Sequence, residues 1–468
     1  MVRVGAVTIS MNGGRSHLLC SHSRKRQLPI SPPILQRVLD SIEAQNLVLL
    51  CGAGLSIPDP SKLMSAVAVA RQIYDDYAAT QVLPAALRED IDQLAGHFLA
   101  SNQFEPLFIN RLVPWNDLTG QPNEGHAAVG DFLLSRAARA ALSANFDPMV
   151  EQWSSQRKVQ LRGALDGTQA TAYADSTSPL LKFHGCMNLD RARTLWTQGQ
   201  LALADINERV ESCKNWMGLN LPHRDLLVVG FWTDWGYFND VLAAVLGGGA
   251  TNSITVIDPQ PSALLEAKAP TLWATLSASR LFAHVEASGN EVLPEIRRAY
   301  SKVWTRKLYS LGAPLYQAEK GIAAPAGGFD APDLDVEAFY DLRRDSEGVP
   351  MNRAARQKSP GLSAAQTGLA HLLMNAVADG WKGSWYTKAG QTIRVVHGAG
   401  EGLTTVEDRF TEPPTAPKAD IVICAGAMDQ GVPGSIMGKG SPAGIVRSKA
   451  GAGSRWITLE AAKVELAL

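Results

Sequence analysis

Residues 47–58 read LVLLCGAGLSIP, and this stretch decides the fold. It begins with four consecutive apolar residues, Leu47 to Leu50, and continues into the glycine turn of residues 52–54. An apolar run without polar alternation is typical of a strand that is buried on both faces of a parallel sheet. The stretch therefore predicts a strand of an α/β domain in which helices cover both sides of the sheet.

Similar apolar runs recur along the chain, and helical stretches such as HAAVGDFLLSRAARA separate them. The runs occupy residues 141–145, 180–183, 226–229 and 254–257. Repeated alternation of strand and helix predicts a doubly wound parallel sheet. Residues 81–125 contain short helical patterns and proline-bearing loops instead of strand-like runs, which predicts a helical insertion beside the sheet.

Changes in composition divide the chain into four parts. The first 30 residues carry five basic side chains and no acidic one, without the apolar core of a secretory signal. Glycine, alanine, proline and aspartate dominate the stretch after Tyr309, as is typical of a linker. The predicted parts are a flexible basic extension at 1–30, the sheet domain at 31–310, a linker at 311–360 and a small α+β domain for partner or oligomer contacts at 361–468.

The overall composition excludes several classes of function. The 468 residues include 44 Lys and Arg against 45 Asp and Glu, so no global positive field attracts nucleic acid, and any such contact is local or indirect. A hydrophobic content of 46% and a charged content of 19% are those of a globular, non-disordered protein. No apolar run approaches the roughly 18 residues of a membrane span. We therefore expect no membrane association.

The cysteines argue against a metal site and against disulfides. The five are Cys20, Cys51, Cys186, Cys213 and Cys424. No two of them form a C-x-x-C pair, so we expect no zinc ribbon and no other metal. Their odd number and wide separation argue against a disulfide framework and fit a reducing cytoplasm.

The glycine turn after the first strand is the first candidate site. Gly52, Ala53, Gly54 and Ser56 can bring the backbone close to a pyrophosphate at a helix N-terminus. Ile57 stands where the third glycine of the dinucleotide fingerprint would be. A turn that only packs a helix on a strand fits the partial motif equally well.

Polar residues follow two of the other strands. Asn145, Phe146 and Asp147 come directly after one strand, and His184 with Gly185 follows the next. The carboxyl ends of parallel strands face the crevice where ligands bind, and a neutral imidazole there can accept a proton. Taken singly, the first group is more typical of an Asx turn, and a lone histidine is more often a structural residue.

Two later strands end in Gly230 and in Asp258. A glycine there admits a ligand to the backbone, and an acid there can bind ribose hydroxyls. Trp232 and Trp235 can stack on a base, although core packing is the commoner use of such a pair. In the C-terminal part, VVHGAGEG after a strand is either a small-ligand loop or a plain glycine turn, and GSIMGKGSP lacks the residues of a phosphate-binding loop.

Taken in order, the segments GAGLS, PNEGH, NFD, KFHG, VVG and VIDP resemble the sirtuin superfamily over about residues 50 to 260. Two features differ from the protein deacylases of that family. The chain lacks their paired C-x-x-C motifs, and SIPDPSKL stands in place of their G-I-P-D-F-R loop. It is more similar to the bacterial sirtuin-like effectors of antiphage defence, which hydrolyse NAD+.

This resemblance implies a function and roles for the candidate residues. It implies a sirtuin-like Rossmann domain that takes NAD+ as its substrate and releases nicotinamide and ADP-ribose. Asn145 would position the carboxamide or ribose and the water. His184 would act as general base through the ribose hydroxyls or on the water, and Asp147 would orient Asn145 or the ribose. The remaining residues implied to bind the dinucleotide are Gly52, Ala53, Gly54, Ser56, Phe146, Gly230 and Asp258.

The resemblance also implies partners and leaves alternatives open. The related effectors work with a sensing module such as a short Argonaute or a translocase ATPase, so we expect a regulatory partner and a homo-oligomer. One alternative is a protein deacylase or ADP-ribosyltransferase, which requires a peptide or protein acceptor. Another is a non-catalytic scaffold that binds the nucleotide without cleaving it.

Overall fold

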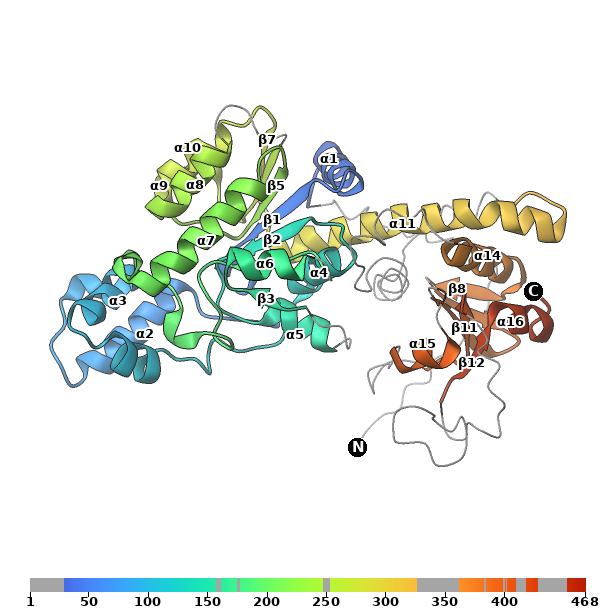
Figure 1. The fold of residues 1–468 in the computed structure, drawn as a ribbon, viewed down its shortest axis with the longest axis horizontal. Coiled ribbons are helices and arrows are strands. Elements are labelled where there is room, and N and C mark those ends of the chain that lie inside the picture. Colours follow the sequence, from blue (N-terminus) through green and yellow to red (C-terminus); the bar gives the residue numbers. More distant parts are fainter. Residues whose placement is uncertain are drawn as a thin grey trace, which may run out of the picture.

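The computed structural model describes residues 29–468, apart from 157–160, 175–176, 247–252, 326–361, 383, 399, 401, 410–417 and 428–452. The predicted basic extension therefore lies outside the described residues except for its last two, and so does most of the predicted linker. Figure 1 shows two sheets of different size and the long helix α11 (Gly289–Lys320), which packs against helices of both parts.

The larger sheet has seven parallel strands in the order β3-β4-β2-β1-β5-β6-β7. Its strands are β1 (Leu47–Cys51), β2 (Ala140–Ser143), β3 (Gly163–Ala164), β4 (Leu180–Lys182), β5 (Asp225–Val229), β6 (Ile254–Ile257) and β7 (Phe282–Val285). All five residues of β1 are buried, as its unbroken apolar sequence predicts. The doubly wound sheet is thus confirmed.

Helices cover both faces of this sheet. One face packs on α1 (Pro32–Glu43), α4 (Glu124–Leu134), α5 (Met149–Gln156) and the first half of α11. The other face packs on α6 (Gly167–Tyr173), α7 (Ala204–Asn220), α8 (Gly236–Leu246), α9 (Ser262–Lys268) and α10 (Pro270–Ser277). Strand residues alternate between the two cores: Leu49 joins the first and Leu50 the second. This alternation is the expected pattern of a strand buried on both sides.

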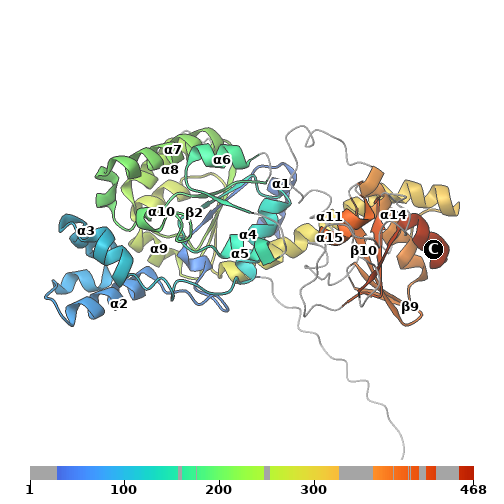
Figure 2. The same ribbon diagram turned by 60° about the horizontal axis from the view of Figure 1, so that its bottom comes forward.

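Only helices lie between β1 and β2, all of whose intervening residues are described. Besides α4, which covers the sheet, they are α2 (Ala66–Ala78), α3 (Ile91–Ala100), the π-helix η3 (Phe104–Leu112) and the short 3₁₀ helices η1 (Ala53–Leu55) and η2 (Ala85–Glu89). Farther along the chain are the 3₁₀ helices η4 (Arg191–Arg193) and η5 (Gln198–Ala202). Both views place α2 and α3 at the end of the molecule away from the smaller sheet (Figures 1 and 2). The predicted helical insertion is confirmed.

The C-terminal part holds a separate mixed sheet of five strands in the order β12-β11-β10-β9-β8. The strands are β8 (Gly380–Lys382), β9 (Trp385–Lys388), β10 (Gln391–His397), β11 (Ile421–Ala425) and β12 (Arg455–Thr458). The helices are α14 (Leu362–Val377), α15 (Leu403–Arg409) and α16 (Leu459–Glu465). The last three strands are parallel, whereas β8 and β9 pair antiparallel. The predicted α+β character of this region is confirmed.

The first ten residues of the predicted linker are helical, which corrects the boundary at residue 311. Helix α11 continues without interruption to Lys320 and packs on α14. A Cβ atom on Gly312 would lie 2.3 Å from the backbone of Gly368, so the two helices cross where both carry glycine. The glycine that suggested a linker is explained by this close crossing.

The glycine turn after β10 packs on the turn after β11. The amide of Gly398 donates to Ala425 O, and that of Gly400 donates to Gly426 O. A Cβ atom on Gly398 would lie 2.5 Å from Ala427 N. These contacts support the plain glycine turn for VVHGAGEG, whereas GSIMGKGSP lies outside the described residues.

Candidate functional site

The carboxyl ends of the parallel strands lie along one edge of the larger sheet. From β1 the chain builds outward through β2, β3 and β4, and it then returns to pair β5 with the other side of β1. In open α/β sheets, ligands bind in the crevice where the strand order reverses in this way. The loops that follow β1, β2, β4 and β5 therefore form the candidate site.

The glycines of the loops after β1 and β5 allow these two loops to pack together. A Cβ atom on Gly52 would lie 2.5 Å from Phe231 Cα, and one on Gly54 would lie 2.7 Å from Gly230 Cα. Gly230 has a φ of 58°, which favours glycine. Close loop packing thus accounts for all three glycines, and their binding of a phosphate stays a prediction.

Most backbone amides of the loop after β1 are already engaged. Gly52 N donates to Val229 O, Gly54 N to Gly230 O, and Ser56 N to Ala53 O. Ala53 is the exposed residue of the turn. A ligand that approached this loop would therefore reach Ala53 more readily than the buried Gly52 and Ser56.

Three of the predicted site residues meet at the Ser56 hydroxyl group. Ser56 Oγ donates to Asp147 Oδ2 at 2.9 Å and accepts from Asn145 Nδ2 at 3.2 Å. Asn145 Nδ2 also donates to Gly52 O at 3.1 Å, which ties the loop after β2 to the loop after β1. Asp147 additionally accepts from Met149 N, as an Asx turn would. This bond supports the Asx-turn interpretation of Asp147, and its role in a functional site stays a prediction.

A histidine at the start of α4, His126, completes this network. Its Nδ1 accepts from Asn123 N at 3.2 Å, so its Nε2 carries the hydrogen and donates to Ser56 Oγ at 3.0 Å. Burial lowers the pKa of His126 to about 4, against an opposing effect of the Asp147 charge. His126 lies in the PNEGH segment, to which the sequence assigned no role beyond the resemblance. It holds the serine hydroxyl as a neutral donor.

Acidification is expected to destabilise the fold through His126. The unfolded histidine has a pKa of about 6.5 and the folded one of about 4, so between these values only the unfolded state takes up the proton. The stabilising contribution is complete above pH 6.5 and falls by about 1.4 kcal/mol per pH unit as the pH drops toward 4. Urea unfolding at several pH values should show a shallower decline for His126→Gln than for the wild type. Equal slopes would contradict this assignment.

A buried lysine, Lys182, holds the loop of residues 145–147 in place. Lys182 Nζ donates to Asp147 O at 2.5 Å and to Glu151 Oε1 at 3.1 Å. Burial alone would lower the pKa of Lys182, but Glu151, with smaller effects of Cys186 and Asp147, outweighs burial and raises it. The sequence did not single out this pair, although a lysine at the end of an apolar strand was a detectable signal. Lys182 is a charged anchor for the loop.

His184 occupies the position after β4 that corresponds to Asn145 after β2, but its neighbours are different. Ser143 and Lys182 are paired in the β2–β4 register, so Asn145 and His184 each follow two residues after that pair. The His184 ring lies 4.7 Å from the Trp235 ring, and its Nε2 is buried without a hydrogen-bond partner. Burial, with the Arg209 charge adding to it, lowers the pKa of His184 to about 3. The structure thus places His184 at the predicted edge, covered by Trp235.

The other two predicted residues have structural contacts. The Phe146 ring packs 4.6 Å from the Trp196 ring, and Phe146 O accepts from Met187 N, which joins the loops after β2 and β4. Asp258 Oδ1 accepts from Gln260 N at the end of β6, two strands from β1. Their contacts with a dinucleotide stay predictions.

The space beside the network is small. A cavity of about 10 Å³ adjoins Asn145, Asp147 and His126, which is room for about one water molecule. A cavity of this size does not hold a dinucleotide. Within the described part of the chain, no group of three or more potential metal ligands occurs. No described helix is long and apolar enough to cross a membrane.

Comparison with protein-family models finds no match, and neither does comparison with curated proteins. Solved structures of similar fold include a triple mutant of a Sir2 homologue in complex with 2′-O-acetyl ADP-ribose (TM-score 0.33, 15% identity, 58% of this chain and 98% of that chain). A complex of a Sir2 homologue with NAD has a TM-score of 0.31 and 16% identity over 57% of this chain and 94% of the other. Sir2Tm bound to a propionylated peptide has a TM-score of 0.30 and 15% identity over 57% of this chain and 98% of the other. These similarities concern the fold.

Proposed function

We propose that this chain is a regulated NAD+ glycohydrolase that releases nicotinamide and ADP-ribose. The observation that carries the proposal is that one sheet edge holds both a fixed amide and an imidazole whose buried Nε2 has no hydrogen-bond partner. Asn145 is held by Gly52 and Ser56, and His184, level with it on the neighbouring strand, has a buried Nε2 without a partner. A buried polar atom without a partner costs free energy, and such atoms are often retained for function. The order of the sirtuin-like motifs independently supports the same assignment.

The reaction breaks the bond between C1′ of the ribose and the ring nitrogen of nicotinamide, and the bonding electron pair leaves with nicotinamide. The ribose carbon gains positive, oxocarbenium-like character, which fixed polar groups around it stabilise. The Asn145 amide binds the carboxamide or ribose and positions the water. Water attacks C1′ and transfers a proton to the neutral His184 imidazole. The products are nicotinamide, ADP-ribose and a proton.

The surroundings of His184 support the proposal that the enzyme is inactive until it is activated. A general base works best when its pKa lies near the operating pH, whereas burial lowers the pKa of His184 to about 3. Trp235 contributes to this burial, and its ring is tilted by 32° against the imidazole. Displacement of Trp235 would admit water and raise the pKa of His184 toward its ordinary value. We propose that activation includes this movement.

Replacing Trp235 by alanine is expected to release the latent activity. Closed enzymes commonly populate the open form at about 10% or less, so nicotinamide release from NAD+ should rise about tenfold or more. Trp273→Ala is the matched control, because Trp273 packs on Phe282 and His284 instead of on His184. Equal amounts of nicotinamide and ADP-ribose should form without any added acceptor.

The same assay separates the alternatives. Release only in the presence of an acyl-lysine peptide would indicate a deacylase, and label transfer to a protein would indicate an ADP-ribosyltransferase. NAD+ binding without nicotinamide release, by both the wild type and Trp235→Ala, would indicate a scaffold. Each of these results would overturn the proposal.

We further propose that the chain acts in antiphage defence by depleting NAD+ in the cytoplasm. An unregulated NAD+ hydrolase would harm its own cell, so a trigger is required. A sensor protein such as a short Argonaute or a translocase ATPase, or assembly into a homo-oligomer, would supply it. The mixed sheet at the C-terminus is the proposed contact region.

A further inference from the structure

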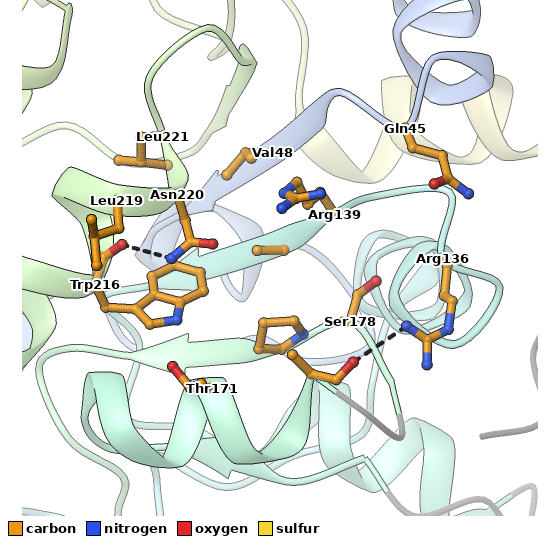
Figure 3. A pocket seen from close by; sticks show the side chains of 13 residues that line it. Gln45, Val48, Arg136, Arg139, Thr171, Ser178, Trp216, Leu219, Asn220 and Leu221 are labelled. Carbon is orange, nitrogen blue, oxygen red and sulfur yellow. Dashed lines mark hydrogen bonds between the residues drawn. The ribbon is translucent and has the colours of Figure 1, made fainter. Parts of the chain in front are cut away.

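The cavities at the two edges of the larger sheet differ in size. A cavity of about 290 Å³ lies at the amino ends of the strands, where Gln45 precedes β1 and Ser178 precedes β4 (Figure 3). The cavity beside Asn145, at the carboxyl ends, has a volume of about 10 Å³. The position of Asn145 is therefore set by direct contacts with its neighbours.

Lys182 joins the strand that precedes His184 to the loop that carries Asn145. It is the last residue of β4, two positions before His184, and its side chain is 1% exposed. Its Nζ donates to the main-chain oxygen of Asp147, two positions after Asn145, at 2.5 Å. One charged side chain thus connects the two strand ends from which the proposed catalytic residues come.

The loop that carries Asn145 is held from two directions. The loop after β1 holds its side chains, since Asn145 donates to Gly52 O and Asp147 accepts from Ser56. Strand β4 holds its main chain at Asp147 O, and the donor there is charged. Hydrogen bonds with a charged donor are shorter and roughly twice as strong as those between neutral groups. Removal of the Lys182 amine would therefore weaken the attachment of this loop to β4.

Three elements of the fold surround the buried charge of Lys182. Glu151 on α5 accepts from Lys182 Nζ at 3.1 Å, and its side chain is 15% exposed. A Cβ atom on Gly163 of β3 would lie 2.6 Å from Lys182 Cδ and 2.8 Å from Glu151 Oε1. Strand β3, strand β4 and helix α5 thus leave the space that the lysine–glutamate pair fills.

Stability alone does not account for this pair. Buried ion pairs can often be replaced by apolar side chains of similar volume without loss of stability, because burial removes both charges from water. Lys182→Met with Glu151→Leu would fill similar space. The apolar side chains would lack the bond to Asp147 O, which is the contact that reaches the loop of Asn145.

We propose that Lys182 is a positioning residue for NAD+ cleavage, which acts through Asn145 by fixing the loop after β2 relative to β4. This inference rests on the proposed function, in which Asn145 places the substrate and the water. A displacement of about 1 Å in such a group can lower the rate about 10²-fold. Because Lys182 acts through Asn145, its effect should vanish when Asn145 is replaced.

A double-mutant cycle in the Trp235→Ala background tests this proposal. Lys182→Met with Glu151→Leu should lower kcat and kcat/KM for nicotinamide release together, by about 10²-fold. The same two changes made on top of Asn145→Ala should lower the remaining rate by less than about twofold, since residues that act as a unit are not additive. An unchanged kcat in the first case, or a further loss of about 10²-fold in the second, would overturn the proposal.

Controls separate positioning from a general loss of structure. The variant Lys182→Met with Glu151→Leu should unfold at nearly the same urea concentration as its parent. Lys463→Met with Glu319→Leu removes a lysine–glutamate pair between α16 and α11 and should keep the kcat of the parent. An equal loss of kcat in this control would overturn the proposal. Lys182→Gln, which removes the charge but keeps a polar side chain, is a milder variant for the same cycle.

Hydrogen exchange measures the order of the loop without turnover. The amide of Asn145 donates to Ser143 Oγ and that of Met149 to Asp147 Oδ1. Both should exchange about threefold faster or more in the apolar variant, whereas β10 should exchange as in the parent. Unchanged exchange would overturn the positioning role. Faster exchange with no nicotinamide release from the Trp235→Ala parent would instead reject the proposed function, and the catalytic effect with it.

Discussion

Replacing Asp131 by alanine is expected to lower the free energy of unfolding by about 3–5 kcal/mol. Asp131 on α4 accepts from Arg297 Nε on α11 at 3.0 Å, and the side chains are 0% and 1% exposed. The Arg297 guanidinium also lies over the Trp153 ring. Removal of the carboxylate takes the Asp131 charge away from the buried guanidinium group of Arg297.

Thermal and urea unfolding measure this effect, and two further variants control it. Glu295→Ala breaks the more exposed pair between Glu295 and Arg298 and should cost less than about 1 kcal/mol. The double variant Asp131→Leu with Arg297→Met removes both charges and should recover much of the stability, because a buried ion pair can be replaced by apolar side chains. An Asp131→Ala protein as stable as the wild type would show that the pair contributes little.

Replacing His184 by alanine is expected to lower NAD+ cleavage by about 10²- to 10⁴-fold, the usual contribution of a general base. The fold should survive, because the imidazole Nε2 makes no hydrogen bond that the substitution would break. Nicotinamide release measures the effect, and the Trp235→Ala background provides a sufficient starting rate. Asn145→Ala should cause a loss of similar order, since it removes the amide that positions the substrate.

His371→Ala is the matched control for this loss. His371 is also fully buried with its pKa lowered to about 3, but it lies on α14 and contacts Tyr386 in the C-terminal part. Circular dichroism should show that all three variants are folded. Undiminished cleavage by His184→Ala, or an equal loss in His371→Ala, would remove His184 from the mechanism.

In the larger sheet, the sequence predicted the five strands with mainly apolar runs and missed the other two. The runs at 47–50, 141–145, 180–183, 226–229 and 254–257 correspond to β1, β2, β4, β5 and β6 within two residues at each end. Strand β3 has only two residues, and β7 reads FAHV with a histidine inside it, so neither has a recognisable pattern. Short edge strands form through pairing with a neighbour, which a local pattern does not reveal.

The candidate site was likewise predictable from the sequence only in part. The meeting of Ser56, Asn145 and Asp147 followed from one rule, that parallel strands end at the same edge. The roles of Lys182 and His126 depend on contacts between distant segments, and so does the cover of Trp235 over His184. Such contacts are set by tertiary packing, so no local sequence motif predicts them.

A crystal structure of the protein with carba-NAD+, an analogue that resists cleavage of the nicotinamide bond, tests the central claim most directly. We predict that the Asn145 amide and the His184 imidazole lie on either side of the ribose that carries nicotinamide, with the Trp235 ring displaced from the imidazole. A dinucleotide bound at another place, or bound while Trp235 still covers His184 and separates it from the ribose, would contradict the proposed catalytic site.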